Sequence, residues 1–75
     1  MEKSLVELFK NKGVWFQKEN EPHWQRWLGR IVDVSDEHLV LLYKGGMQTH
    51  FLREIVFMQE ISNWVDAPPS SGDYS

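Results

Sequence analysis

With 75 residues and a mass of 8.9 kDa, the chain excludes a second folded domain, because a segment below roughly 40 residues seldom buries enough surface to fold alone. Hydrophobic residues make up 41% and charged residues 25%, which is typical of a chain that folds. The absence of cysteine excludes disulfides and thiolate metal sites. The net charge of −3 argues against a general polyanion-binding protein, since such proteins need clustered Lys and Arg.

Two observations concern location. No apolar stretch approaches the roughly 20 residues of a membrane span. Residues 1–4 lack the hydrophobic segment of a secretory signal peptide. We therefore expect a cytoplasmic protein with no membrane partner.

The N-terminal segment predicts a short helix. Ser4 and Glu7 have the spacing of a capping box, in which each side chain bonds the other residue's amide. Gly13 suits the left-handed residue that ends a helix. The apolar stripe at helical spacing consists of Leu5, Leu8 and Phe9. We expect about two turns that pack through this stripe, because so short a helix is unstable alone.

After this helix, β-prone segments alternate with turns. Gly29 lies inside the second segment and indicates a sharp bend. The run Lys44-Gly45-Gly46-Met47 is the strongest hairpin signal in the chain. The expected strands are residues 14–18, 24–34, 38–43, 49–53 and 55–61. One helix and five short strands predict a mainly β fold, a small closed or nearly closed barrel.

The barrel domain is expected to span residues 1–64. Residues 65–75 contain two adjacent prolines and small polar residues, so we expect a disordered C-terminal tail there. The runs 39–43 and 55–58 do not alternate with polar residues, so both faces of those strands require burial. One five-stranded sheet with one short helix cannot cover both faces. The sequence therefore predicts association of subunits through sheet edges.

Two motifs support a family resemblance. Gly29-Arg30-Ile31 followed by residues 36–41 fits the shape of a glycine in a bent second strand and then Asp-x-aromatic/His-Met-Asn-hydrophobic. Residues 51–56 match a short hydrophobic stretch, a basic residue and a hydrophobic strand. In this order the chain resembles the Sm-like family of Sm, Lsm and bacterial Hfq subunits, over about residues 4–61. The resemblance implies an SH3-type, strongly bent five-stranded barrel with an N-terminal α-helix. The interval from Gly29 to Asp36 is one residue longer than usual, which implies a bulge or a shifted register.

The resemblance also implies an assembly and a ligand. Family members pair strand four of one subunit with strand five of the next, so we expect a cyclic homo-oligomer of five to seven subunits. The interface residues would be Phe51, Ile55, Val56, Phe57 and Met58. The ligand would be single-stranded RNA near the pore, contacted by His38, Arg53, Asp36 and Val40. His38 would stack on a base, Arg53 would supply charge and Asp36 would orient its loop. Val40 and Glu54 stand where the family has a base-reading Asn and a Gly.

Other interpretations of these residues stay open. His38 suits a turn, and Arg53 could pair with Glu54, with Asp36 or with a neighbouring subunit. The four tryptophans, which are Trp15, Trp24, Trp27 and Trp64, suit a core or an interface as well as a stacking platform. The three histidines lack metal-binding spacing, and no nucleophile elbow or phosphate loop occurs, so we expect no enzyme, cofactor or metal. The alternative function is a structural or adaptor barrel of SH3 or Tudor type that binds a protein partner.

Overall fold

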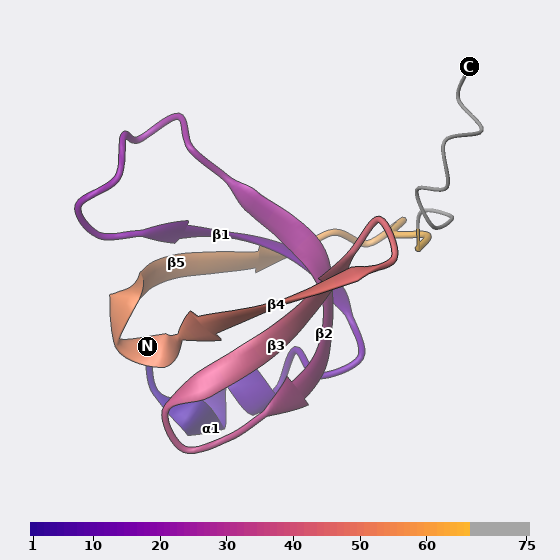
Figure 1. Ribbon diagram of the computed structural model, residues 1–75, viewed down its shortest axis with the longest axis horizontal. Coiled ribbons are helices and arrows are strands. Elements are labelled where there is room, and N and C mark those ends of the chain that lie inside the picture. The colour runs from indigo at the N-terminus through magenta and orange to yellow at the C-terminus, as the bar shows by residue number, and fades with distance from the viewer. Residues whose placement is uncertain (67–75) are drawn as a thin grey trace.

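A computed structural model describes residues 1–66, which form one short helix and one five-stranded antiparallel sheet (Figure 1). The elements are α1 (Lys3–Glu7), β1 (Gly13–Lys18), β2 (Trp27–Val34), β3 (His38–Tyr43), β4 (Gly46–Phe51), the 3-10 turn η1 (Leu52–Glu54) and β5 (Ile55–Glu60). The expected mainly β class is confirmed. Of the predicted tail, residues 67–75 lie outside the described residues. Within residues 1–66, no helix is long and apolar enough to cross a membrane.

The strands lie in the order β4-β3-β2-β1-β5, so β4 and β5 are the two edges. No ladder joins these edges within residues 1–66, and the sheet is therefore not closed into a barrel, in contrast to the expected closed or nearly closed form. Only η1 connects the edges. Four residue steps reach at most about 14 Å, whereas the edges of a flat five-stranded sheet lie about 19 Å apart. The sheet must therefore curl until β4 and β5 approach each other.

The pairing of β2 with β3 is irregular, in agreement with the expected bulge or shifted register. The pairing register shifts between Ile31 and Asp33, which accommodates one extra residue in β2. Gly29 lies in β2 for a steric reason. A Cβ atom there would lie 2.6 Å from the Leu42 carbonyl oxygen and 2.7 Å from Leu41 Cγ. Glycine therefore lets β2 and β3 approach closely.

The β3–β4 hairpin confirms the predicted turn. Lys44 and Gly45 both have positive φ values, 52° and 77°, as a two-residue type I′ turn requires. Because the turn is so short, pairing begins at once between Tyr43 and Gly46. The fourth strand consequently starts three residues earlier than residue 49, where we expected it.

The helix differs from its prediction at both ends. Glu2 is the N-cap, and no side chain caps the helix, so the Ser4–Glu7 capping box is wrong. Ser4 lies inside α1 instead. The left-handed residue after the helix is Asn11, with φ of 67°, whereas Gly13 belongs to β1. The physical cause at the start is an anchored chain end, because the Met1 ammonium donates to the carbonyls of Leu52 and Ile55, at 2.5 and 3.1 Å.

The packing face of the helix also differs. Leu5 and Leu8 are 49% and 68% exposed, whereas Val6 is fully buried. Val6 belongs to a core whose other members are Val14, Phe16, Ile31, Leu39, Leu41, Leu52, Ile55 and Met58. Val6 is the only buried residue of α1. Of the expected stripe, only Phe9, which lies beyond the end of α1, is partly buried against the core.

The segment after β5 packs back on the sheet. The Ile61 amide donates to the Gly13 carbonyl at 2.8 Å, and Trp64 lies directly against Gly13. Asp66 accepts from Trp64 Nε1 at 2.8 Å and from Arg30 Nε at 2.9 Å. These contacts extend two residues beyond the expected domain limit at residue 64.

Gly13→Ala is expected to lower the free energy of unfolding by about 1–3 kcal/mol, because its methyl group would overlap the Trp64 side chain. Gly46→Ala is the matched control. Its Cβ would meet nothing closer than the Tyr43 carbonyl oxygen at 3.7 Å, so we expect no loss of stability. Chemical denaturation of both variants measures the difference. Equal stability of the two variants would show that Trp64 does not hold this position.

Candidate functional site

Three side chains meet where β3 begins and β4 ends. His38 and Phe51 are opposite each other in the β3–β4 ladder, and their rings lie 5.6 Å apart between centroids at an angle of 31°. The Arg53 guanidinium carbon lies 4.8 Å from the centroid of the Phe51 ring. Two expected RNA-binding residues, His38 and Arg53, therefore come together through Phe51. We call these three side chains the His38–Phe51–Arg53 stack.

The turn before β3 fixes the histidine ring. Ser35 Oγ lies 2.7 Å from His38 Nδ1, and the Ser35 hydroxyl also lies 3.1 Å from the His38 carbonyl oxygen. The Ser35 amide donates to the same carbonyl oxygen at 2.8 Å. The imidazole is thus held by a compact turn, as expected for a turn histidine. It also stays half-exposed, so one part of its surface is open to a ligand.

Asp36 contacts the helix. Its carboxylate lies 3.0 Å from Lys3 Nζ, and this hydrogen bond and charge raise the pKa of Lys3. A cavity of about 210 Å³ lies between the β2–β3 turn, the start of the chain and η1. Asp36 and Arg53 both line it, so the expected loop residue and the expected cation share a hollow. The only side-chain hydrogen bond of Asp36 within residues 1–66 is the one to Lys3, which is not the local contact we expected.

Arg53 and Glu54 do not form the pair that we considered. Glu54 lies 3.5 Å from Lys18 Nζ, so a different cation compensates its charge. Among the described residues, Arg53 takes part in no ion pair. Val40 is half-buried two residues after His38, on the same face of β3, and offers only apolar contact. The site thus supplies one aromatic ring, one imidazole and one uncompensated guanidinium.

The expected interface residues fall into two groups. Ile55 and Met58 are 2% and 8% exposed and belong to the core of the subunit. Phe51, Val56 and Phe57 are 41%, 57% and 45% exposed. Side chains of the first group are therefore withdrawn from the surface, and those of the second group remain available for contact.

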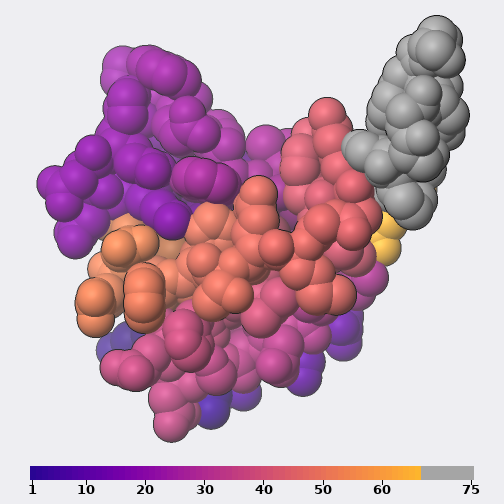
Figure 2. Space-filling model, in the orientation of Figure 1, coloured from indigo at the N-terminus to yellow at the C-terminus, as the bar shows by residue number. Residues whose placement is uncertain are grey.

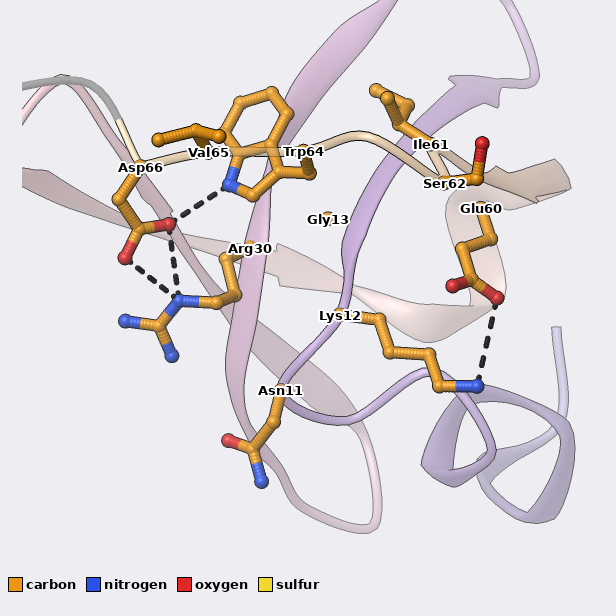
Figure 3. A pocket seen from close by; sticks show the side chains of 10 residues that line it. All are labelled: Asn11, Lys12, Gly13, Arg30, Glu60, Ile61, Ser62, Trp64, Val65 and Asp66. Carbon is orange, nitrogen blue, oxygen red and sulfur yellow. Dashed lines mark hydrogen bonds and ion pairs between the residues drawn. The ribbon is translucent and has the colours of Figure 1, made fainter.

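A larger cavity of about 450 Å³ lies near Trp64, at the end of the sheet where β1 begins (Figure 3). Arg30 Nε donates to both oxygens of Asp66, at 3.1 and 2.9 Å, and Lys12 lies 3.5 Å from Glu60. The Trp64 hydrogen bond, followed by the Arg30 contacts, lowers the pKa of Asp66. Each cation here has its own carboxylate, so this cavity offers no excess charge to an ionic ligand.

A long loop, residues 19–26, projects from the sheet between β1 and β2 (Figures 1 and 2). The His23 carbonyl oxygen accepts from Gln17 Nε2 at 2.6 Å and from Arg26 Nη1 at 2.5 Å. Arg26 also lies over the Trp15 ring, 4.6 Å from its centroid. These contacts hold a loop on which Trp24 is 68% exposed. The loop also explains why β2 begins at Trp27, three residues later than expected.

Sequence reasoning missed Phe51 as the residue that links His38 and Arg53. A signal was present, because counting outward from a two-residue turn at Lys44-Gly45 places residue 51 opposite residue 38.

No group of three or more potential metal ligands occurs within residues 1–66. No family model, curated protein or solved structure matches this chain. A functional proposal therefore depends on the fold and these contacts.

Proposed function

We propose that the protein is a non-catalytic, Sm-like homo-oligomeric ring that binds single-stranded RNA near its pore. The observation that carries the proposal is that both edge strands are unprotected and unpaired on their outer sides. β4 contains no charged residue and no proline, and β5 contains one charge, at its last residue Glu60. Natural edge strands are commonly protected by lysine, proline or a cover. Neither edge strand has the first two protections, and within residues 1–66 no strand pairs with the outer side of β4 or of β5.

Exposed apolar side chains accompany both edges. Met47 and Phe51 on β4 are 69% and 41% exposed, and Val56 and Phe57 on β5 are 57% and 45% exposed. Pairing β4 of one subunit with β5 of the next satisfies the free backbone groups and brings these side chains together. Two different edges make a head-to-tail contact, which closes into a ring when each subunit adds a constant rotation. The curl of the sheet supplies such a rotation, and the family resemblance suggests five to seven subunits.

The His38–Phe51–Arg53 stack is the proposed RNA contact. Aromatic and guanidinium surfaces accept unstacked bases of single strands. Arg53 has no carboxylate partner among the described residues, so its charge is available to a phosphate. One such contact is weak, and the net charge of −3 adds no general attraction. A ring repeats the stack around one axis, and the repeated contacts act together on one strand.

Val56→Lys is expected to dissociate the ring, because pairing at β5 would desolvate an ammonium group that has no partner. Val56 is 57% exposed within the subunit, so the fold itself should tolerate lysine. Sedimentation velocity measures the assembly, and thermal unfolding confirms that the subunit is folded. Val65→Lys is the matched control, at a position that is 82% exposed outside both edges. An unchanged sedimentation coefficient for Val56→Lys would contradict pairing through β5.

Arg53 and His38 are expected to contribute to RNA binding in different ways. Arg53→Ala is expected to make the salt dependence of binding shallower, by about 0.7 in logarithmic slope for each phosphate that the protein no longer neutralises. His38→Ala is expected to weaken binding by about 1–3 kcal/mol, the range for removing one stacked base, with the slope unchanged. Fluorescence anisotropy with labelled oligo-U and oligo-A measures both effects.

Lys44→Ala is the control for Arg53→Ala, because Lys44 is an exposed cation at the opposite end of β4. It should leave affinity and slope unchanged. If the parent protein binds neither oligonucleotide at low salt, the RNA part of the proposal is wrong, whereas the proposed ring is judged by sedimentation alone.

Trp24 supports a second candidate function, an adaptor of SH3 or Tudor type that binds a protein segment. A tryptophan that is 68% exposed on a hydrogen-bonded loop has the character of a binding hot spot, because little ordering remains to be done when a partner docks. This candidate does not need Arg53 or His38.

Under the adaptor function, peptides selected against the parent should quench its tryptophan fluorescence. They should bind Trp24→Ala with a loss of about 2 kcal/mol or more, as for a hot-spot residue. Leu8→Ala is the matched control, since Leu8 is also 68% exposed. Equal affinity of peptides for the parent and Trp24→Ala would remove this candidate.

A further inference from the structure

β4 is attached to the core by a single side chain. His50 is 4% exposed, and every other residue of β4 is exposed. The only strand that pairs with β4 within residues 1–66 is β3. Burial elsewhere in the sheet is shared among several aliphatic side chains, whereas the burial of this edge strand depends on one imidazole.

The surroundings of His50 suit only its neutral form. Its ring lies edge-on to Phe16 and Trp27, at 5.1 and 4.8 Å between centroids. Nε2 lies 3.2 Å from Gln48 Oε1, and Nδ1 is buried with no hydrogen-bond partner within residues 1–66. An amide oxygen only accepts, so Nε2 carries the hydrogen and Nδ1 is the bare nitrogen. Protonation would place a charged N–H among apolar rings with no acceptor.

Charged groups from three neighbouring elements face this ring. Lys18 of β1 lies over the Trp27 ring, 4.8 Å from its centroid, and disfavours a second positive charge. Glu21 of the 19–26 loop accepts from Trp27 Nε1, and Glu54 of η1 pairs with Lys18. Both carboxylates favour a positive charge on His50 and so raise its pKa. Burial is the largest effect and Lys18 adds to it, so the pKa of His50 falls from 6.5 to about 4.

We infer that protonation of His50 releases β4 from the core while the rest of the sheet stays folded. In the attached strand the imidazole remains neutral down to about pH 4, whereas in the released strand it titrates at its ordinary value near 6.5. The released form binds more protons between these values. The contribution of the neutral imidazole to attachment is therefore fully present above pH 6.5, and the attachment equilibrium weakens by about tenfold for each unit as the pH falls toward 4. β4 is thus a pH-sensitive edge strand. Its release also displaces Phe51 and so separates the His38–Phe51–Arg53 stack.

The inference goes beyond the proposed ring and does not depend on it. β4 amides that donate to β3 report the opening whether or not subunits associate. Hydrogen exchange measured by NMR from pH 6.5 to 4.5 is the test, with protection factors corrected for intrinsic rates. We expect protection of these β4 amides to fall by about tenfold per pH unit and to stay below that of the β1–β2 amides at every pH, because exchange in the β1–β2 ladder requires unfolding of the whole sheet. Equal protection of the two ladders at every pH, or no fall in β4, would overturn the inference.

Variants identify the responsible group. His50→Phe keeps an aromatic ring between Phe16 and Trp27 and should abolish the pH dependence in β4, whereas the exposed-histidine control His23→Gln should retain it. If His50→Phe does not fold, Lys18→Met is the second variant that tests the role of His50. Removing the facing ammonium should raise the pKa of His50 in the attached strand, as followed by NMR, so the fall in β4 protection with decreasing pH should level off at a higher pH than in the parent. A β4 protection curve that is unchanged although this pKa rises would refute the role of His50.

Discussion

The short connection between the two edge strands is the constraint on which the structure depends. β4 and β5 lie at opposite ends of the strand order, yet only Leu52–Glu54 separates them in the chain. A flat sheet is too wide for this link, so the sheet curls and the apolar faces enclose a core. Gly29 lets neighbouring strands approach closely, and the bulge after Ile31 adds local twist. The curl stops before the edges pair, and this leaves two free edges on one small subunit.

The features of the surface follow from this open curl. Phe51 ends β4 just before the link, so it lies beside His38 across the hairpin and beside Arg53 in η1. The same residue belongs to a free edge, which places the proposed RNA contact and the proposed subunit contact next to each other. His50 faces inward from that edge and controls its attachment. Assembly, ligand contact and pH response therefore converge on β4 under the two proposals.

Local patterns predicted much of the fold. The boundaries of β3 and the hairpin at residues 44–47 follow from strand propensity and from the two glycines. The irregularity in β2 agrees with the bulge or shifted register that the family resemblance implied. The helix was less predictable, because α1 contacts the sheet through Val6 and begins where an anchored chain end allows. The pairing of Arg53 with Phe51, and of Glu54 with Lys18, depends on how η1 crosses between the edges. Such contacts are tertiary and leave no periodic signal in the sequence.

The central claim is that the free edges of one subunit meet those of another. Multi-angle light scattering on the parent chain at micromolar concentrations and near-neutral pH tests it most directly. Edge pairing in a closed ring should give one discrete species of five to seven times the chain mass of 8.9 kDa, constant across dilution. A mass of 8.9 kDa at those concentrations, or a mass that grows without limit, would contradict a closed ring.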